Sequence, residues 1–188
     1  AQKRKDWNGL ISGFKASDLV FLDESGCNTD MTRRYAYSLG GSRAVDSAPL
    51  SKPKNTTILS SIQLDGTLRY TTFSGGTTVE RFKRYLETDL LPHLNGNSVL
   101  IMDNMKSHHA KAVRNLLDSS EIRYIYLPPY SPDLNPIEKL WSKVKSFLRK
   151  FKARTLDALP NAIQCAFQTV SPSDCSGWFH SCGYSPYF

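Results

Sequence analysis

The chain has 188 residues, of which 40% are hydrophobic and 22% are charged, a composition typical of one globular domain, at most with a small appendage, that excludes a disordered or membrane protein. Its longest apolar runs, such as residues 99–102, are far too short to cross a bilayer, so we expect no membrane association. The formal net charge of +7 favours a polyanionic partner, either nucleic acid or an acidic surface.

The cysteines and the first residues of the chain indicate the cellular compartment in which we expect the protein. The four cysteines form no C-x-x-C pair and show no histidine spacing typical of zinc, so we interpret them as reduced thiols of a cytoplasmic protein. A disulfide among the last three, which lie close together in sequence, stays open. Residues 1–6 are largely charged and no apolar signal segment follows, so nothing indicates export.

The first half of the chain predicts a β-rich unit. Residues 18–24 are mostly apolar and predict a buried strand that ends in acid, and residues 34–39 alternate enough to predict a second strand. Residues 42–56 contain prolines, serines and lysines and predict an exposed loop.

A hairpin is expected next, over residues 57–64 and 67–73. These β-rich runs flank Asp65-Gly66, and a two-residue Asp-Gly connection predicts a turn in which both residues have positive φ. The first half is therefore expected to be a three-stranded antiparallel unit or close to it.

The second half alternates helices and strands. Residues 77–80 open a helix that ends before Pro92, and residues 98–102 predict a buried strand followed by acid. Residues 107–119 then predict a helix. Its inward residues are expected to be Ala112, Val113, Leu116 and Leu117.

Residues 122–127 predict a further strand, and a proline-rich loop over residues 128–136 leads into the longest helix, over residues 136–152. A last helix covers about residues 155–170, with an interruption near Pro160. The order of elements predicts a mixed α/β sheet with helices on its faces. The stripe of the longest helix comprises Ile137, Leu140, Trp141, Val144, Phe147, Leu148 and Phe151.

Two of the apolar strands lead into an aspartate, Asp23 in one case and Asp103 in the other. Open α/β sheets place chemistry at strand ends, so the two side chains meet at one edge if the strands are neighbours. Two carboxylates that close repel each other, and a divalent metal ion neutralises them. The alternative for each is an aspartate that starts a turn or caps a helix, and spacing alone does not decide between them.

Glu138 is the third candidate. Asn135 is placed as an N-cap, Pro136 as the first helical residue, and the glutamate follows two residues later. Glutamate near this position is a common capping-box residue, and it is also a candidate metal ligand. The two roles are not exclusive.

With these residues the chain resembles the catalytic domain of DDE transposases of the mariner-like superfamily, in their bacterial insertion-sequence branch. The matching motifs are Phe-Leu-Asp-Glu-Ser at 21–25, Met-Asp-Asn-Met-Lys-Ser-His at 102–108, and Leu-Pro-Pro-Tyr-Ser-Pro-Asp-Leu-Asn-Pro-Ile-Glu at 127–138. Residues 178–184 also look like the ending of this family. The 34 residues between Asp103 and Glu138 are an interval typical of the branch. The resemblance implies a ribonuclease H-like fold, with a mixed five-stranded sheet and helices on both faces.

The resemblance also implies the site. Asp23, Asp103 and Glu138 would be the catalytic residues and the ligands of two Mg²⁺ or Mn²⁺ ions, which favour oxygen ligands and act on the attacking and leaving oxygens of a phosphodiester. Water would free the element ends, and the exposed 3′-hydroxyl would then attack target DNA. Asn104 and His108 match supporting residues of the family, and His108 would either orient a carboxylate or touch DNA.

Basic residues concentrate on the longest helix beside this site, where they would contact DNA phosphates, although a solvated helix face is the alternative. They are Lys139, Lys143, Lys145, Arg149, Lys150 and Lys152. Weaker candidates are Arg33, Arg34, Lys52 and Lys54.

The expected organisation is a lead-in segment at 1–17, the catalytic domain at 18–153, and a helical extension at 154–188 packed on the same domain. By resemblance the partners are transposon ends and target DNA, with a dimer in the full-length protein, no organic cofactor, and a bacterial cytoplasmic, nucleoid-associated location. Such transposases usually carry an N-terminal helix-turn-helix region, so we expect this piece alone to bind DNA weakly. Two rival functions are a nuclease that does not join strands and a non-catalytic DNA-binding or assembly module.

Overall fold

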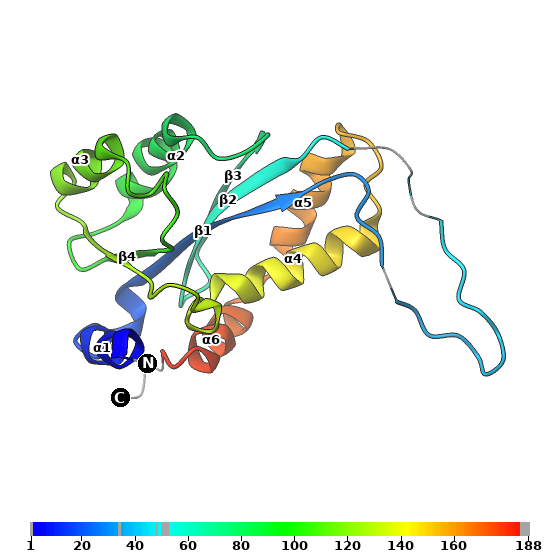
Figure 1. The fold of residues 1–188 in the computed structure, drawn as a ribbon, viewed down its shortest axis with the longest axis horizontal. Coiled ribbons are helices and arrows are strands. Elements are labelled where there is room, and N and C mark those ends of the chain that lie inside the picture. The colour runs from blue at the N-terminus through cyan, green and yellow to red at the C-terminus, as the bar shows by residue number, and fades with distance from the viewer. Residues whose placement is uncertain (1, 34, 48, 50–52, 185–188) are drawn as a thin grey trace.

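The computed structural model describes residues 2–33, 35–47, 49 and 53–184 (Figure 1). Five strands form one sheet in the order β3-β2-β1-β4-β5, in which β1 pairs antiparallel with β2 and parallel with β4. They are β1 (Leu19–Cys27), β2 (Thr56–Gln63), β3 (Leu68–Ser74), β4 (Val99–Met102) and β5 (Arg123–Tyr126). The mixed five-stranded sheet and its three-stranded antiparallel part are therefore confirmed.

Helices cover both faces of the sheet, with α2 and α3 on one side and α4, α5 and α6 on the other (Figure 1). The α-helices are α1 (Gln2–Ile11), α2 (Val79–Tyr85), α3 (Lys111–Ser119), α4 (Ile137–Phe151), α5 (Ala158–Gln168) and α6 (Pro172–Ser181). A π-helical turn (Leu86–Leu90) and a 3₁₀ turn (Leu91–His93) continue α2, and further 3₁₀ turns cover Ala16–Asp18 and Pro132–Leu134. Within the described part of the chain, no helix has both the length and the apolar character that a membrane crossing needs.

The sheet separates two hydrophobic cores, because successive side chains of a strand point to opposite faces. Val20 and Leu22 of β1 pack into the core under α2 and α3, whereas Phe21 packs into the core under α4, α5 and α6. Trp7 of α1 and Phe179 of α6 belong to that second core. All three expected segments thus share one core, and the boundaries at residues 17 and 153 stay predictions.

The strand expected at residues 34–39 is wrong for the part that the structure describes, because residues 35–39 form no strand. Tyr35, Tyr37 and Leu39 are 91%, 106% and 88% exposed, so neither side of this segment faces a core. Residues 35–47 instead extend away from the body of the molecule (Figure 1). Alternation of residue types predicts a strand only where a neighbouring strand offers backbone partners, and β2 already occupies that edge of β1.

The base of this loop is attached to the C-terminal end of α4. Arg154 Nη1 donates hydrogen bonds to the carbonyl oxygens of Thr29 and Met31, at 3.2 and 3.1 Å. Lys152, which ends α4 with a φ of 54°, pairs through Nζ with Asp46 Oδ1 at 2.6 Å. The expected loop is confirmed for the described residues of 42–55, most of which are exposed, whereas Thr56 already belongs to β2.

The hairpin of β2 and β3 is confirmed, but its turn differs from the prediction. Gly66 has a φ of 93°, whereas Asp65 is not among the residues with positive φ. The N–H of Gly66 donates to Gln63 O at 3.2 Å, and the Asp65 carboxylate accepts from the N–H of Thr67 at 2.8 Å. A turn of type I followed by a left-handed glycine explains this pattern, because the aspartate can then cap the turn with its own side chain.

The helices near His108 and Pro160 differ from the prediction. The helix expected from residue 107 begins at Lys111, and Ala112 is exposed rather than inward, because residues 106–109 form turns that carry a buried histidine. Pro160 lies within the first turn of α5 and does not interrupt it, since proline lacks only an N–H that a first turn leaves unpaired anyway. The structure assigns the four cysteines as free, which agrees with the interpretation as thiols.

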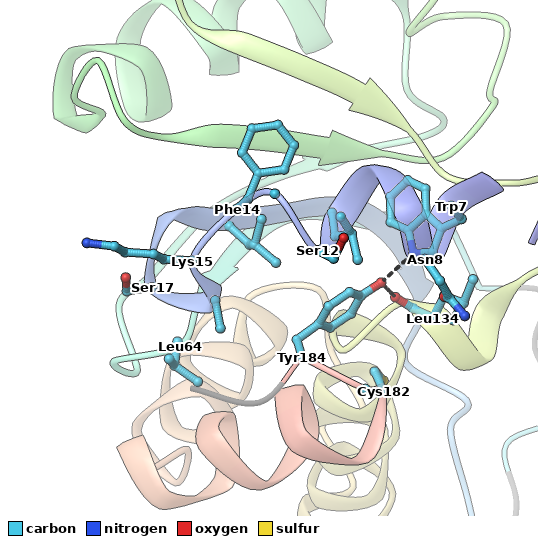
Figure 2. Close-up of a pocket in the computed structure, with 15 residues that line it drawn as sticks. Trp7, Asn8, Ser12, Phe14, Lys15, Ser17, Leu64, Leu134, Cys182 and Tyr184 are labelled. Atoms are coloured by element: carbon cyan, nitrogen blue, oxygen red, sulfur yellow. Dashed lines mark hydrogen bonds between the residues drawn. The ribbon is translucent and has the colours of Figure 1, made fainter. Parts of the chain in front are cut away.

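The two ends of the described chain meet beside the loop that precedes α4 (Figure 2). Trp7 Nε1 donates to the hydroxyl of Tyr184 at 3.2 Å, and that hydroxyl donates to Leu134 O at 2.7 Å. A cavity of about 680 Å³ opens between α1 and the end of α6 at this point. The helix α1 was not expected, and α6 lies within the helical extension expected at 154–188; both contacts support the loop that leads into Glu138.

Candidate active site

The sheet brings the two predicted aspartates together. Leu22 of β1 is in register with Met102 of β4, so Asp23 and Asp103 follow paired residues at the same edge. Glu138 lies in the first turn of α4, and all three carboxylates line one cleft of about 590 Å³. The prediction that the first strand ends at its acid is wrong, because β1 continues to Cys27, paired only with β2 beyond this point.

Asp23 is the most enclosed of the three carboxylates, with 7% of the residue exposed. Its Oδ1 accepts the N–H of Glu24 at 2.8 Å, and its Oδ2 accepts Nε1–H of Trp141 at 3.2 Å. Burial, with smaller contributions from the nearby carboxylates of Asp103 and Glu138, raises the pKa of Asp23 to about 7 against the opposing hydrogen bond from Glu24. The buried carboxylate of Asp23 therefore holds its proton more tightly than an exposed aspartate does.

Asp103 has a different environment. Its Oδ1 accepts the N–H of Met105 at 3.0 Å and faces Nδ1 of His108 at 2.8 Å. Although burial opposes ionisation, these hydrogen bonds lower the pKa of Asp103 below its usual value. The second aspartate is therefore held as a carboxylate.

His108 is completely buried, with 0% of the residue exposed, and its ring stacks on Phe82 at a centroid distance of 4.2 Å. Its Nε2 lies 3.2 Å from Glu24 Oε2. Burial alone would lower the pKa of this imidazole, but the hydrogen bonds to Asp103 and Glu24 raise it to about 9. Of the two roles considered for His108, orienting a carboxylate fits this enclosure, and touching DNA does not.

Glu24 was not anticipated as part of the site. It follows Asp23 directly on β1, lines the same cleft, and contacts His108 with its side chain. Its Oε1 is buried and has no hydrogen-bond partner within the described residues. Two adjacent acids at the end of an apolar run were the signal that could have identified it.

Asn104 links the end of β4 to the proline-rich loop. Its Nδ2 donates to Leu127 O at 2.5 Å, and its Oδ1 lies 3.3 Å from Nε2 of His109. Tyr130, at the exposed tip of that loop, has a φ of 55° and also lines the cleft. The supporting role expected for Asn104 is thus a contact between two walls of the cleft.

Glu138 does not act as a cap. Pro136, which precedes α4, offers no side-chain capping hydrogen bond, and within the described residues the buried Oδ1 of Asn135 has no partner. The start of α4 is instead closed by a backbone hydrogen bond, in which the carbonyl of Asn135 accepts the N–H of Glu138 at 3.1 Å. The exposed Glu138 carboxylate is therefore available to the cleft.

The donor set suits a hard divalent cation, because Mg²⁺ and Mn²⁺ prefer carboxylate oxygens. Burial raises the pKa of Asp23 most, and the nearby carboxylates of Asp103, Glu138 and Glu24 add smaller contributions in the same direction. Across the residues that the structure describes, however, no three or more His, Cys, Asp or Glu side chains are arranged so that they could hold one metal ion as they stand. Ligation of one ion by all three acids would therefore need side-chain rotation.

The predicted DNA-contacting residues divide into two groups. Lys145 and Arg149 lie seven and eleven residues after Glu138, on the same stripe of α4, and line a hollow of about 910 Å³ with Arg33 and the end of β1. Lys139, Lys143 and Lys150 line a separate hollow towards α6. Lys143 forms an ion pair with Asp174 at 2.5 Å, and Lys152 is paired with Asp46. Of the weaker candidates, Lys54 is exposed, and Arg34 and Lys52 lie outside the described residues.

A mixed five-stranded sheet with two acidic strands side by side, and a glutamate at the start of a covering helix, defines a ribonuclease H-like domain with an acidic cleft. The chain belongs to the family described as DDE superfamily endonuclease, whose model matches residues 18–160. It is 28% identical over 97 residues to the transposable element Tc1 transposase of Caenorhabditis elegans, which covers 50% of this chain.

Solved structures share the fold. The pre-cleavage Mos1 transpososome matches 95% of this chain with a TM-score of 0.79 and 19% identity, and the catalytic domain of Mos1 mariner transposase matches 95% with a TM-score of 0.67 and 17% identity. The chain covers 36% of the Tc1 transposase, 57% of the Mos1 chain in the transpososome and 85% of the Mos1 catalytic domain. It therefore spans only part of the complete relatives.

Proposed function

We propose that this chain is the catalytic domain of a transposase, which cleaves DNA strands and joins them to target DNA with the carboxylates of Asp23, Asp103 and Glu138. The observation that carries the proposal is the register of β1 and β4, which places both aspartates at one sheet edge, in the cleft that Glu138 also lines. The relatives are described as transposases, and Mos1 paired-end complexes have been solved with Mn and with Mg. We extend divalent-metal use, with two ions, to this chain.

The residues of the cleft have different roles in such a site. When bound, divalent ions stabilise charge on phosphate oxygens and activate water or a 3′-hydroxyl as the nucleophile. Trp141 and the N–H of Glu24 hold Asp23 in one orientation, and His108 and the N–H of Met105 hold Asp103. Glu138 has no capping bond to break, so its side chain is free to turn towards the aspartates. Two fixed carboxylates and one adjustable carboxylate can thus serve both cleavage and joining.

The wider assignments form part of the same proposal. Transposon ends and target DNA are the proposed partners, and the Mos1 paired-end complexes support a dimer of the full-length protein. The interval of 34 residues between Asp103 and Glu138 supports the bacterial insertion-sequence branch. A bacterial cytoplasmic, nucleoid-associated location follows from that branch and stays a prediction.

The experiment that tests the function combines cleavage and joining. The chain is incubated with supercoiled plasmid and a labelled duplex ending in a free 3′-hydroxyl, with Mn²⁺, Mg²⁺ or chelator, beside the Asp103→Asn variant. We expect metal-dependent nicking and transfer of the label into plasmid, both absent in the variant. Nicking without transfer would favour a nuclease, and neither activity together with no Mn²⁺ binding would favour a non-catalytic module.

The division of the basic residues predicts which of them contact DNA. Replacing Lys145 and Arg149 by alanine should weaken binding to duplex DNA by at least about tenfold at 50 mM salt, and should reduce the slope of log affinity against log salt by about 2, because each lost phosphate contact removes about 0.9. The matched control replaces Lys139 and Lys150, which lie on the other side of α4. Fluorescence anisotropy across a salt series measures both quantities. Equal losses in the two double variants would show that the whole helix acts as a diffuse positive surface.

A further inference from the structure

A chain of side-chain contacts runs from β1 to the second aspartate. Glu24 Oε2 lies 3.2 Å from Nε2 of His108, and Nδ1 of the same ring lies 2.8 Å from Oδ1 of Asp103. Each ring nitrogen faces a carboxylate oxygen, which can only accept, so the imidazole donates at both ends. Strand β1 carries Asp23 and, at the next position, Glu24. Through Glu24 and His108 the same strand is linked to Asp103.

The ring of His108 is fixed from every side that the structure shows. Phe82 of α2 stacks on it at 4.2 Å, and the hydroxyl of Tyr126 donates to the backbone carbonyl of His108 at 3.0 Å. None of the residue is exposed. A ring in this enclosure cannot reach a nucleic acid, and both of its nitrogens are already engaged, so it is not a metal ligand in this arrangement.

The hydrogen bonds on Asp103 also select one of its oxygens. Nδ1 of His108 and the N–H of Met105 both point at Oδ1, at 2.8 and 3.0 Å. Neither bond reaches Oδ2, and the carboxylate lines the cleft that Asp23 and Glu138 share. The two donors thus fix the rotation of the carboxylate and leave one oxygen to meet a cation.

We propose that Glu24 and His108 are positioning residues: Glu24 orients the imidazole, and the imidazole orients Asp103 so that Oδ2 faces the metal site. The inference rests on the proposed function, because it takes Asp103 as a metal ligand. Partners that hold a ligand in this way typically change metal affinity by about 10- to 100-fold when they are removed. Glu24 acts through His108, and this gives a positioning role to its carboxylate, whose buried Oε1 has no hydrogen-bond partner within the described residues.

The test uses two substitutions of His108 by amide residues, each of which retains one of the two hydrogen-bond donors of the imidazole. Asparagine places an amide N–H near the position of Nδ1, so His108→Asn keeps a donor for Asp103. Glutamine places its amide near the position of Nε2, so His108→Gln keeps only the contact to Glu24. We expect His108→Gln to weaken Mn²⁺ binding by about 10- to 100-fold, and His108→Asn to retain most of the affinity of the unmodified chain. Calorimetry and the electron paramagnetic resonance of free Mn²⁺ measure the affinity without DNA.

Controls separate positioning from packing. Leu90→Ala opens a cavity in the same core but leaves Phe82, His108 and both carboxylates in place, so it should lower the melting temperature and leave Mn²⁺ affinity unchanged. Glu24→Ala should weaken Mn²⁺ binding, whereas Glu24→Gln, which still offers an acceptor to Nε2, should preserve it. This second pair repeats the comparison if His108→Gln does not fold. Combining Glu24→Ala with His108→Gln should weaken binding no more than His108→Gln alone, because one residue acts through the other.

The outcomes distinguish this inference from the function on which it rests. Asp103→Asn should abolish measurable Mn²⁺ binding at the same site. If it binds Mn²⁺ as the unmodified chain does, Asp103 is no ligand and the proposed function is overturned. If Asp103→Asn loses the metal while both His108 variants keep it, or lose it equally, the positioning role is overturned and the function stands. Additive losses from Glu24 and His108 would likewise overturn the linked role.

Discussion

Glu138→Gln is expected to reduce metal-dependent DNA cleavage by about 10³-fold or more while leaving the fold intact. Loss of a metal ligand removes several kcal/mol of transition-state stabilisation, and each 1.36 kcal/mol corresponds to about tenfold in rate. The same change should have little effect on stability, because Glu138 is exposed and contributes no capping hydrogen bond to α4. A carboxylate near a helix N-terminus contributes at most about 1 kcal/mol, which corresponds to about 2–4 °C in melting temperature for a chain of this size.

Glu80→Gln is the matched control. Glu80 is an exposed glutamate in the first turn of α2, as Glu138 is in the first turn of α4, but it lies outside the cleft. Because the Glu80 carboxylate accepts hydrogen bonds from its own N–H and from Thr78, this control should lower the melting temperature at least as much as Glu138→Gln does, and it should leave cleavage unchanged. The measurements are nicking rates of supercoiled plasmid under single-turnover conditions and thermal unfolding by circular dichroism. Normal cleavage by the Glu138→Gln protein would show that two aspartates alone form the site.

The buried strands and the meeting of their aspartates could be predicted from sequence, because both properties follow from short-range patterns. Runs such as residues 99–102 are apolar on both faces, as a central strand covered by helices on both sides requires. Once two such strands are neighbours and parallel, their ends share one edge, and Asp23 and Asp103 must approach each other. The family motifs then identified Glu138, whose local sequence is equally typical of a cap.

The support for these acids could not be predicted, because it depends on contacts between distant segments. Glu24 and His108 are separated by 84 residues, and the sequence around His108 is typical of a helix start. The local pattern does not show that the chain folds back at residues 106–109 to bury the ring. Trp141 illustrates the same point, since it fits an apolar helix stripe and also donates to Asp23 at 3.2 Å.

Residues 35–39 show the opposite failure, in which a local pattern predicted an element that the fold does not use. A strand needs an edge to pair with and a core to cover, and the described residues of this segment have neither. The basic residues of α4 were likewise predicted as one group from their spacing. Their division by ion pairs with Asp174 and Asp46 depends on α6 and on the long loop, which the helix sequence does not contain.

The metal-free protein should lose stability as the pH rises, mainly through Asp23. Its pKa is about 7 in the folded protein, against an ordinary value of 3.8 that applies to the unfolded chain. Between these values the folded protein keeps a proton that the unfolded chain has released, so the free energy of unfolding decreases as pH rises through this window. The full loss, present above pH 7, is on the order of 4 kcal/mol, because each pH unit of the window contributes about 1.4 kcal/mol.

Asp23→Asn should remove this dependence, because asparagine is neutral at every pH and can still accept a hydrogen bond from Trp141 or Glu24. We expect equal stability near pH 4 and a more stable, catalytically inactive variant at pH 8, measured as thermal unfolding in chelator at a series of pH values. His108, whose pKa is raised to about 9, adds stability below pH 6.5 that is lost as pH rises through 9, in the variant and the unmodified chain alike. The difference between the two profiles therefore isolates Asp23. Mn²⁺ should raise the melting temperature of the unmodified chain most at pH 8, where the buried carboxylate of Asp23 is ionised. Parallel stability profiles of the two proteins in chelator would contradict the prediction, because they would show that the negative charge of Asp23 is already compensated within the protein.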